Sequence, residues 1–307
     1  MSLTDVVVIG AGPAGLTAAV YLGRFHRKVV VIDGGDSRAR WIPRSHNIPG
    51  FVHGIAGTEF LAHVRVQARQ YGANIHPGAV SEIHRSSEGF LVATGSHRFE
   101  SRYVILATGI KDRLPPLPGA AEAVLRSLLR ICPICDAFEA TGRAIAIIGD
   151  GEHGAREAEF LRVYSDNITL IHIGPKCESD THDRLSRQGI QVLESPLEFL
   201  KLRSTDLTVH LPGQEPRTFD VCYCALGCVP QNQLATSLGA RRDTAGALIV
   251  NSHQETSIRG LYAAGDVVRG LNQVVVAGAE AAIAATDIHN QLRRRDSADN
   301  QRRIDVI

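Results

Sequence analysis

Two cysteines, Cys132 and Cys135, stand three residues apart, and Asp136 follows them directly. Such a pair can hold a metal ion, form a structural disulfide, or shuttle electrons by opening and closing a disulfide. Pro133 suits the first turn of a helix, and residues three apart then share one face of that helix. Because a helix N-terminus lowers the pKa of a thiol and favours the thiolate, this arrangement suits redox chemistry.

The metal alternative needs further ligands, because a zinc site usually takes four. Cys222, Cys224 and Cys228 are the candidates, but their spacing is irregular. They stand in a strand-like apolar run, residues 220–228, where cysteine behaves as a small apolar filler. Cys177 stands alone and is interpreted as an incidental loop thiol. We therefore predict no metal site.

Composition limits the remaining choices. The chain has 307 residues, enough for two domains, with 44% hydrophobic and 21% charged residues and a net charge of +1. This charge favours neither nucleic acid nor an anionic membrane as a partner. No basic region precedes the apolar run that begins by Val6, and no apolar stretch is long enough to span a bilayer. We expect a cytoplasmic protein, in a reducing compartment where a structural disulfide is improbable.

The elements that must position this chemistry begin with a glycine loop near the N-terminus. An apolar run, residues 6–9, predicts a buried strand, and a helix is predicted from near Pro13. Between them the three glycines of a G-x-G-x-x-G motif are Gly10, Gly12 and Gly15. Asp33 ends the next apolar run, about 20 residues further on, where an acid hydrogen-bonds a ribose hydroxyl. Strand, turn, helix and acid together predict a dinucleotide site.

A second copy of this pattern follows the cysteine pair. Its glycines are Gly149, Gly151 and Gly154, and the strand after its helix is predicted over residues 168–173. No acid ends that strand. A third segment, a short strand followed by Gly265 and Asp266, has no glycine loop of its own and is expected to complete the first site. The fold class is therefore α/β, with two Rossmann-like nucleotide-binding domains.

Six motifs recur in a known order: the N-terminal glycine loop, the C-x-x-C-D, and HNIPGF, ILATGI, ALGCVP and LYAAGDVV, which begin at residues 46, 105, 225 and 261. In these the sequence resembles the low-molecular-weight thioredoxin reductase family over nearly its whole length. The resemblance implies an FAD domain in two pieces, 1–111 and 242–307. A domain inserted into it, 112–241, ordinarily binds NADPH and carries the cysteine pair. It also implies a homodimer.

The resemblance assigns roles residue by residue. It implies that Cys135 faces the flavin, that Cys132 exchanges with a partner disulfide, and that Asp136 moves the proton. Asp136 could instead be only a stabilising charge at a helix N-terminus. Asn47 would lie in the segment lining the flavin. The cofactor-binding residues implied for FAD are Gly10, Gly12, Pro13, Ala14, Gly15, Asp33, Gly34, Asn47, Ala107, Thr108, Gly109, Gly265, Asp266, Gln273 and Val274.

The second loop departs from the family where NADPH should bind. Members that use NADPH end the following strand in a His-Arg-Arg-like run, but here His172 is followed by Ile173 and Gly174. Lys176 is the nearest cation in the sequence. Losing charge-assisted contacts at about 1.5–3 kcal/mol each would weaken NADPH by orders of magnitude. The alternative is a nucleotide site rearranged around Lys176 and Arg156; a second flavin, or nothing, could also occupy it.

The function predicted is therefore an FAD-dependent thiol–disulfide oxidoreductase that does not use NADPH as its ordinary donor. It resembles the NADPH-independent relatives, which are ferredoxin-linked, diflavin or dithiol-oxidase types. The expected partner is a thioredoxin-like protein or a small dithiol or disulfide, with ferredoxin or another protein as a possible electron donor. Three alternatives stay open: an NADPH-dependent thioredoxin reductase, an oxygen-using small-molecule dithiol oxidase, and a flavin redox sensor.

Overall fold

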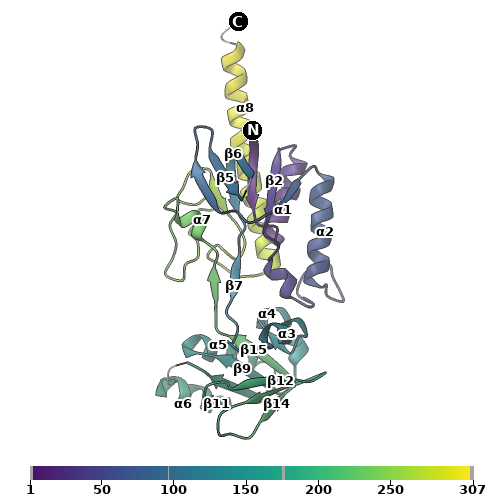
Figure 1. The fold of residues 1–307 in the computed structure, drawn as a ribbon, viewed down its shortest axis with the longest axis vertical. Helices are drawn as coiled ribbons and strands as arrows, with labels where there is room; N and C mark the ends of the chain where they lie inside the picture. Colours follow the sequence, from purple (N-terminus) through teal and green to yellow (C-terminus); the bar gives the residue numbers. More distant parts are fainter. Residues whose placement is uncertain (1–2, 96, 175–176, 305–307) are drawn as a thin grey trace. The chain divides into compact units, whose positions relative to one another are not determined.

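The structure is a computed structural model that describes residues 3–95, 97–174 and 177–304. The chain forms two compact units (Figure 1). Unit 1 contains the residues up to Arg40, Thr58–Lys111 and the chain from Pro230 onward, and unit 2 contains Trp41–Gly57 and Asp112–Val229. Both units have parallel strands connected through helices, which confirms the predicted α/β class.

Unit 1 is built on one sheet with the strand order β3-β2-β1-β6-β5-β4, in which β17 also pairs with β6. The pairs among β1, β2, β3, β6 and β17 are parallel, whereas β4 and β5 pair antiparallel, as do β5 and β6. The strands are β1 (Thr4–Ile9), β2 (Val29–Asp33), β3 (Asn74–Pro77), β4 (Glu82–Arg85), β5 (Phe90–Thr94), β6 (His97–Leu106) and β17 (Leu261–Ala263). As predicted, the segment containing Gly265 joins the first glycine unit.

Alternating side chains of this sheet pack into two cores. Val6 and Val8 of β1 face a cluster with α1 and α8, while Val7 and Ile9 face the opposite cluster. Helix α8 begins at Val274 and continues to Ile304. The helices of this unit are α1 (Pro13–Arg24), α2 (Gly57–Gln70), α7 (Gln233–Thr236) and α8 (Val274–Ile304), with a short 3₁₀ helix η1 (Arg38–Trp41). The carboxyl ends of β1 and β2 thus meet the start of α1, where a dinucleotide site is expected.

Unit 2 is built on a parallel sheet with the order β11-β10-β9-β15-β8. Its strands are β8 (Leu129–Arg130), β9 (Ile145–Gly149), β10 (Ile168–His172), β11 (Gln191–Glu194) and β15 (Val221–Ala225). An antiparallel sheet adds β12 (Phe199–Leu202), β13 (Leu207–His210) and β14 (Arg217–Phe219). The helices are α3 (Ala120–Leu125), α4 (Pro133–Asp136), α5 (Gly151–Leu161) and α6 (Ser179–Arg187), with η2 (Phe138–Ala140).

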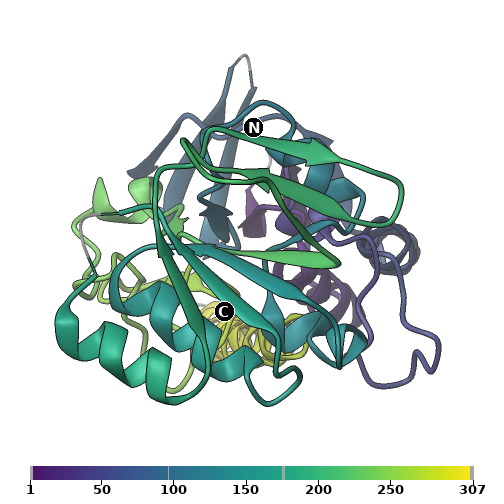
Figure 2. The same ribbon diagram turned by 90° about the horizontal axis from the view of Figure 1, so that it is seen from below.

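The two faces of the unit 2 sheet have different neighbours. Seen from below, α5 and α6 lie together on one side of the strands (Figure 2). On that face Tyr223 of β15 packs with Leu161 and other residues of the helices. On the other face Cys222 and Cys224 pack with residues of β12–β14. The alternation of β15 therefore directs Tyr223 to the helix face, where α4 also lies.

The unit boundaries differ from the predicted domain ranges in two places. The chain leaves unit 2 at Val229 rather than at 241, because Ala235 and Ala240 pack in a core cluster of unit 1. The segment Trp41–Gly57 groups with unit 2, although the prediction assigned it to the FAD domain. Strands β7 (Ile110–Asp112) and β16 (Cys228–Pro230) pair where the chain passes between the units.

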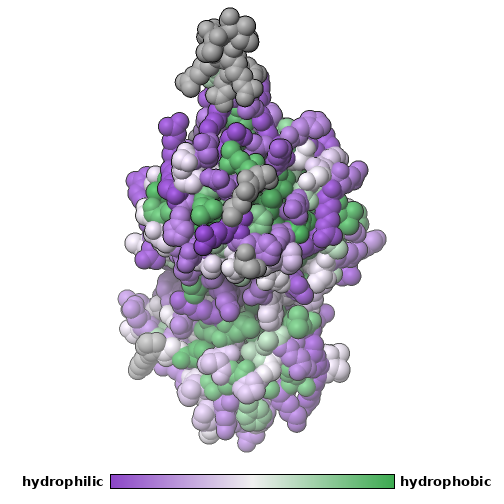
Figure 3. Space-filling model, turned by 45° about the horizontal axis from the view of Figure 1, so that its top comes forward, coloured by the Kyte–Doolittle hydropathy of each residue, from purple (hydrophilic) through white to green (hydrophobic). Residues whose placement is uncertain are grey.

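The face of the molecule drawn in Figure 3 carries mostly hydrophilic residues, interspersed with smaller hydrophobic areas. No helix within the described part of the chain has the length and hydropathy needed to cross a bilayer.

Candidate active site

Cys132 and Cys135 form a disulfide at the start of α4, with their Cα atoms 5.3 Å apart. Cys132 is the N-cap residue and has an extended backbone, and Pro133 occupies the first helical position. The Cys135 amide donates a hydrogen bond to the Cys132 carbonyl oxygen at 3.0 Å. The predicted arrangement of the pair at a helix N-terminus is therefore confirmed.

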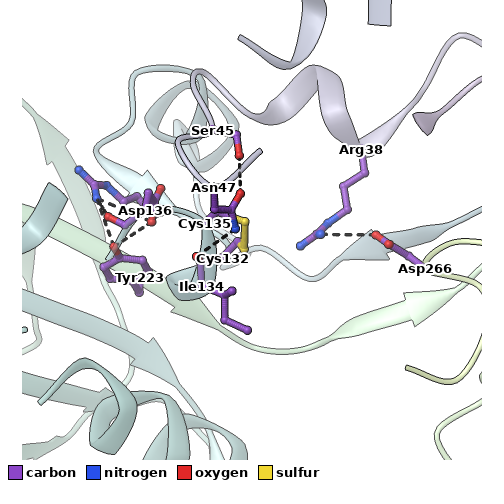
Figure 4. The surroundings of a disulfide bond; sticks show 10 residues. Arg38, Ser45, Asn47, Cys132, Ile134, Cys135, Asp136, Tyr223 and Asp266 are labelled. Carbon is purple, nitrogen blue, oxygen red and sulfur yellow. Dashed lines mark hydrogen bonds and ion pairs between the residues drawn. A yellow bond between two sulfur atoms is a disulfide. The ribbon is translucent and has the colours of Figure 1, made fainter. Parts of the chain in front are cut away.

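Asn47 lies beside this disulfide within unit 2 (Figure 4). Its side-chain amide donates to the Ile134 carbonyl oxygen at 3.1 Å, and its own carbonyl oxygen accepts from the Ser45 hydroxyl at 2.8 Å. The family resemblance groups Asn47 with the FAD-binding residues, yet in the structure it is held against the cysteine helix. Its contact with the flavin stays a prediction.

A cavity of about 110 Å³ adjoins the disulfide within unit 2. One wall is apolar, and the other carries the sulfurs and charged side chains. The apolar lining residues are Trp41, Ile42, Pro43, Val124, Leu129 and Ile131, and the remaining ones are Arg44, His46, Ser127, Arg130, Cys132, Cys135, Asp136 and Glu139. Because part of the lining comes from residues 41–46, far along the sequence from the cysteines, the sequence did not reveal this cavity.

Asp136 has a mostly buried carboxyl group that contacts two side chains overlooked in the sequence. The Tyr223 hydroxyl donates to Asp136 Oδ1 at 2.9 Å, and Arg130 Nη1 lies 3.7 Å from the same oxygen. Burial raises the pKa of Asp136 to about 6, although Arg130 and the hydrogen bond from Tyr223 lower it. Asp136 can therefore both accept and release a proton near neutral pH, as an acid–base group for thiol exchange must.

In unit 1 the first glycine loop has the close packing that its motif requires. Gly10 has a φ of +109°, and a Cβ at Gly15 would lie only 1.9 Å from the Gly10 carbonyl oxygen. Ala107 donates its amide to the Ile9 carbonyl oxygen at 2.8 Å, which brings the segment after β6 to the same loop. A Cβ at Gly265 would lie 2.9 Å from the Cβ of Ala14. Three predicted cofactor segments thus meet at the start of α1.

The polar groups around this loop fit a dinucleotide. No side chain caps the N-terminus of α1, so its first amides remain available for a pyrophosphate. Asp33, at the end of β2, accepts from the Gly35 amide at 2.9 Å and pairs with Arg65 at 2.6 Å. Asp266 lies 3.5 Å from Arg38 Nη1 (Figure 4). The residues of unit 1 therefore fit FAD, with Asp33 at the end of β2, where an acid binds the ribose in such sites.

In unit 2 the second loop has the same close packing, since a Cβ at Gly149 would lie 2.8 Å from the Gly154 Cα. Its polar surroundings differ. The Gly151 amide donates to His172 Nε2 at 3.0 Å, so a side chain of the same unit already binds a loop amide. Asp150 precedes α5 as its N-cap and places a carboxylate next to the loop. These groups disfavour an anionic pyrophosphate.

The lack of a phosphate-binding cation at the tip of β10 stays a prediction from the sequence. Ile173 and Gly174 follow His172, and Lys176 lies outside the described residues. Arg156 is bound instead to Glu152 at 3.1 Å. Glu152 also forms an ion pair with Arg184 at 2.9 Å. Arg156 is therefore part of a surface ion-pair network on α5 and α6 and not of the loop.

The other cysteines behave largely as predicted. Cys222 and Cys224 are buried free thiols on β15, and burial raises the pKa of both, that of Cys224 to about 12. Cys177 is also buried, and Cys228 is partly exposed in β16. In residues 3–95, 97–174 and 177–304 no group of three or more His, Cys, Asp or Glu side chains is arranged to hold a metal.

A CxxC disulfide inside a nucleotide-binding-type unit, joined to a second such unit, defines the class of flavin-linked disulfide oxidoreductases. The family model described as Pyridine nucleotide-disulphide oxidoreductase matches residues 4–281, and the chain belongs to that family. Within it, the chain is 30% identical to the thioredoxin reductase of Treponema pallidum (strain Nichols), over 92% of this chain and 94% of that protein. The enzyme is thus a flavoprotein disulfide oxidoreductase of the thioredoxin reductase type.

Further similarities agree with this assignment. The thioredoxin reductase of Bacillus subtilis (strain 168) is 27% identical over 93% of this chain and 94% of its own length. The crystal structure of HlmI superposes with a TM-score of 0.90 at 31% identity, covering 97% of this chain and 95% of that one. The likeness therefore extends over both units.

Proposed function

We propose that this enzyme passes electrons between FAD, the Cys132–Cys135 pair and a dithiol or disulfide partner, without NADPH as its ordinary donor. The observation that carries the proposal is the contrast between the two loops. Both helices begin without a side-chain cap, but the first loop has Asp33 at the neighbouring strand end, whereas in the second the Gly151 amide binds His172 and Asp150 adds a carboxylate.

FAD would be held by unit 1. The N-terminus of α1 would bind the pyrophosphate, Asp33 the ribose, and Asp266 the ribityl or pyrophosphate portion. Gln273 and Val274 would present the start of α8 to the flavin ring. When bound, FAD supplies a two-electron acceptor and donor for the cysteine pair.

The roles within the pair follow the family resemblance, with Cys132 exchanging and Cys135 facing the flavin. A Cys132→Ser variant should retain Cys135 as a thiolate against the flavin and show a long-wavelength charge-transfer absorption band. A Cys135→Ser variant should lack it. The opposite pattern would exchange the two roles, and a band in neither variant would contradict electronic contact between the pair and the flavin.

The cavity beside the disulfide favours a small dithiol or disulfide as the partner. Its volume of about 110 Å³ accommodates part of a small organic molecule, and its apolar wall would bind the carbon skeleton next to the sulfurs. A thioredoxin-like protein is the second candidate, supported by the names of the relatives and by Phe138, which is 78% exposed three residues after Cys135.

Anaerobic stopped-flow reduction tests the donor. NADPH, NADH and dithiothreitol are mixed in parallel with the FAD-loaded enzyme, and the flavin band near 450 nm is followed. We expect slow bleaching by both nicotinamides and fast bleaching by the dithiol. Fast bleaching by micromolar NADPH would instead establish an NADPH-dependent thioredoxin reductase, which is the second candidate function. A flavin-to-protein ratio above one would indicate a second flavin in unit 2.

Turnover assays separate the remaining candidates. Oxygen consumption with small dithiols would identify a dithiol oxidase, and electron transfer from reduced ferredoxin would identify a ferredoxin-linked enzyme. No turnover with any dithiol, disulfide or donor would leave a flavin redox sensor.

We also propose a homodimer, as in the small members of the family. Helix α8 carries exposed apolar side chains, among them Val275 at 51% and Ile283 at 42%, which could contribute to a subunit contact. Light scattering should give twice the 33.1 kDa chain mass at micromolar concentration. A stable monomer mass over that range would contradict the proposal.

A further inference from the structure

A chain of three polar side chains connects the sheet of unit 2 to the cysteine helix (Figure 4). Arg130 Nη1 donates to the Tyr223 hydroxyl oxygen at 3.2 Å, and that hydroxyl donates to Asp136 Oδ1 at 2.9 Å. Arg130 Nη1 also donates to the Asp136 backbone carbonyl at 2.6 Å. Three elements, β8, β15 and α4, are therefore tied together at the carboxyl group of Asp136.

The hydroxyl group of Tyr223 lies in a buried place, so it needs a hydrogen-bond partner. Tyr223 is fully buried in the core between the sheet and the helices, where a phenylalanine would fill the same space. A buried hydroxyl that lacks a partner costs about 1–3 kcal/mol, so its presence requires a partner. Here the partner is the carboxylate next to the redox pair, and the Arg130 side chain, only 11% exposed, fixes the direction in which the hydroxyl points.

We propose that Tyr223 is a positioning residue for proton transfer at the cysteine pair, oriented by Arg130. By binding Oδ1 it holds the Asp136 carboxyl in one orientation and leaves Oδ2 to exchange a proton with a reacting sulfur. This inference rests on the proposed role of Asp136 and deepens it, because it assigns the regulation of that proton to a strand residue 87 positions away.

The step that this arrangement would serve is the oxidation of a dithiol by the pair. One substrate thiol gives its proton to Asp136 Oδ2, and its sulfur attacks Cys132 Sγ. The Cys132–Cys135 bond breaks, and its electron pair leaves on Cys135 Sγ. The second substrate thiol releases its proton to solvent and attacks the first substrate sulfur. Cys132 Sγ then leaves and takes the proton from Asp136.

The balance of this step is complete without a further reactant. The substrate dithiol loses two electrons and two protons and becomes a disulfide. The pair gains two electrons and one proton, which leaves Cys132 as a thiol and Cys135 as a thiolate, and one proton passes to solvent. Asp136 begins and ends as a carboxylate, so the step is fastest when the pH lies above the pKa of Asp136.

The charged and titratable groups that face Asp136 come from four elements. They are Arg130 on β8, Tyr223 on β15, Glu139 on η2 and His46 on the segment 41–57. Burial raises the pKa of Asp136 to about 6, while Arg130 and the Tyr223 hydrogen bond lower it. Removing the hydroxyl should therefore move this pKa further upward, because the carboxylate loses a donor that stabilises its charged form.

The test is Tyr223→Phe in the FAD-loaded enzyme. The rate of flavin reduction by dithiothreitol is measured from pH 5 to pH 9 and divided by the wild-type rate at each pH. We expect this ratio to fall about three- to tenfold near pH 6 and to return to within twofold of one above pH 8. A Tyr223→Phe ratio that stays flat across the range would overturn the proposal.

A matched control exists in unit 1. The buried Tyr262 hydroxyl donates to Asp287 Oδ2 at 2.6 Å, so Tyr262→Phe removes the same kind of hydrogen bond away from the cysteines. The Tyr262→Phe variant should have a lower melting temperature, but its ratio to the wild-type rate should not change with pH. If the rate ratios of Tyr223→Phe and Tyr262→Phe fall equally near pH 6, the effect is structural and the proposal is wrong.

Two further variants keep the outcome decisive. For Arg130→Gln the rate ratio should likewise fall near pH 6 and recover above pH 8. This variant tests the proposal if Tyr223→Phe fails to fold. Asp136→Asn should remove the acid limb of the pH profile altogether. If Asp136→Asn leaves that limb in place, the proposed role of Asp136 fails. If Asp136→Asn removes it but Tyr223→Phe and Arg130→Gln do not shift it, only the positioning role fails.

Discussion

In unit 1 the glycine loop leads into α1 past Ala11, and in unit 2 the matching loop leads into α5 past Asp150. In both loops the first and third glycines pack against backbone at distances that leave little room for a side chain, whereas the middle glycine does not. The strand after the first helix ends in Asp33, whereas the strand after the second ends in buried His172. The two loops thus share one backbone architecture but carry different polar groups. This indicates that the close packing serves the fold, and that a few side chains determine which ligand binds.

The largest effect should come from placing a carboxylate in the first loop. Gly12 has a φ of −78°, which other residues adopt without strain, so Gly12→Asp should fold. Its charge would face the pyrophosphate of FAD, and we expect FAD affinity to fall by about three orders of magnitude, giving colourless protein. Flavin absorbance after reconstitution measures this. Gly12→Asn has the same size without the charge and should bind FAD more tightly than Gly12→Asp; equal loss in both would assign the effect to size.

A smaller but opposite effect should follow from giving the second loop its missing cations. A Cβ at Gly174 would lie 2.7 Å from the Asp150 Cβ, so the exchange requires Asp150→Gly together with Ile173→Arg and Gly174→Arg. Two charge-assisted contacts at about 1.5–3 kcal/mol each should raise the rate of flavin reduction by low NADPH at least about 100-fold, and that by NADH much less.

The matched control for this gain carries glutamines at 173 and 174 beside the same Asp150→Gly change. Stopped-flow rates at micromolar nicotinamide separate charge from shape. Equal gains with the arginine and glutamine variants, or equal gains for NADPH and NADH, would show that the 2′-phosphate is not what the loop lacks.

The smallest effect concerns the helices behind the loops. Buried Ala18 of α1 corresponds in position to Glu157 of α5, whose Oε2 is buried without a hydrogen-bond partner. Burial, with a contribution from the nearby Asp112, raises the pKa of Glu157 from 4.5 to about 7. The folded state therefore holds this proton more tightly than the unfolded state does. Stability should fall as the pH rises from about 4.5 to about 7 and then level off.

Glu157→Gln removes the ionisable carboxyl group and with it this pH-dependent loss of stability. The variant should be more stable than the wild type by about 1 kcal/mol at pH 8, and the difference should shrink below pH 5. Urea unfolding of both proteins at the two pH values measures it. A difference that does not change with pH would show that the carboxyl group ionises without cost, for example through its contact with His153 at 3.3 Å.

The residues that could be predicted from the sequence are those whose role is local. The glycine loops, the strand that ends in Asp33 and the helix start at Pro133 depend on neighbours within a few residues, and all three occur in the structure. The absence of arginines after His172 was likewise visible in the sequence. Such features need only backbone geometry and spacing, and for that reason pattern reasoning finds them.

The features that escaped prediction depend on contacts between distant segments. Tyr223 stands in a run that was interpreted as apolar core, and its hydroxyl reaches Asp136 only because alternation on β15 directs it to the face where α4 lies. The segment Trp41–Gly57 joins unit 2 through packing that no local pattern marks. Hydrogen-bond partners that tertiary packing brings together cannot be recognised from the spacing of residues along the chain.

Trp41 forms part of the apolar wall of the cavity beside the disulfide, and it is the only tryptophan in the chain. Light absorbed at 295 nm therefore excites a single indole, and all of its emission originates at this wall. A nearby disulfide quenches indole emission more than a pair of thiols does. The flavin-free enzyme thus contains an optical probe of its own, whose brightness should report the oxidation state of Cys132–Cys135 and the arrival of a small ligand in the cavity without any added label.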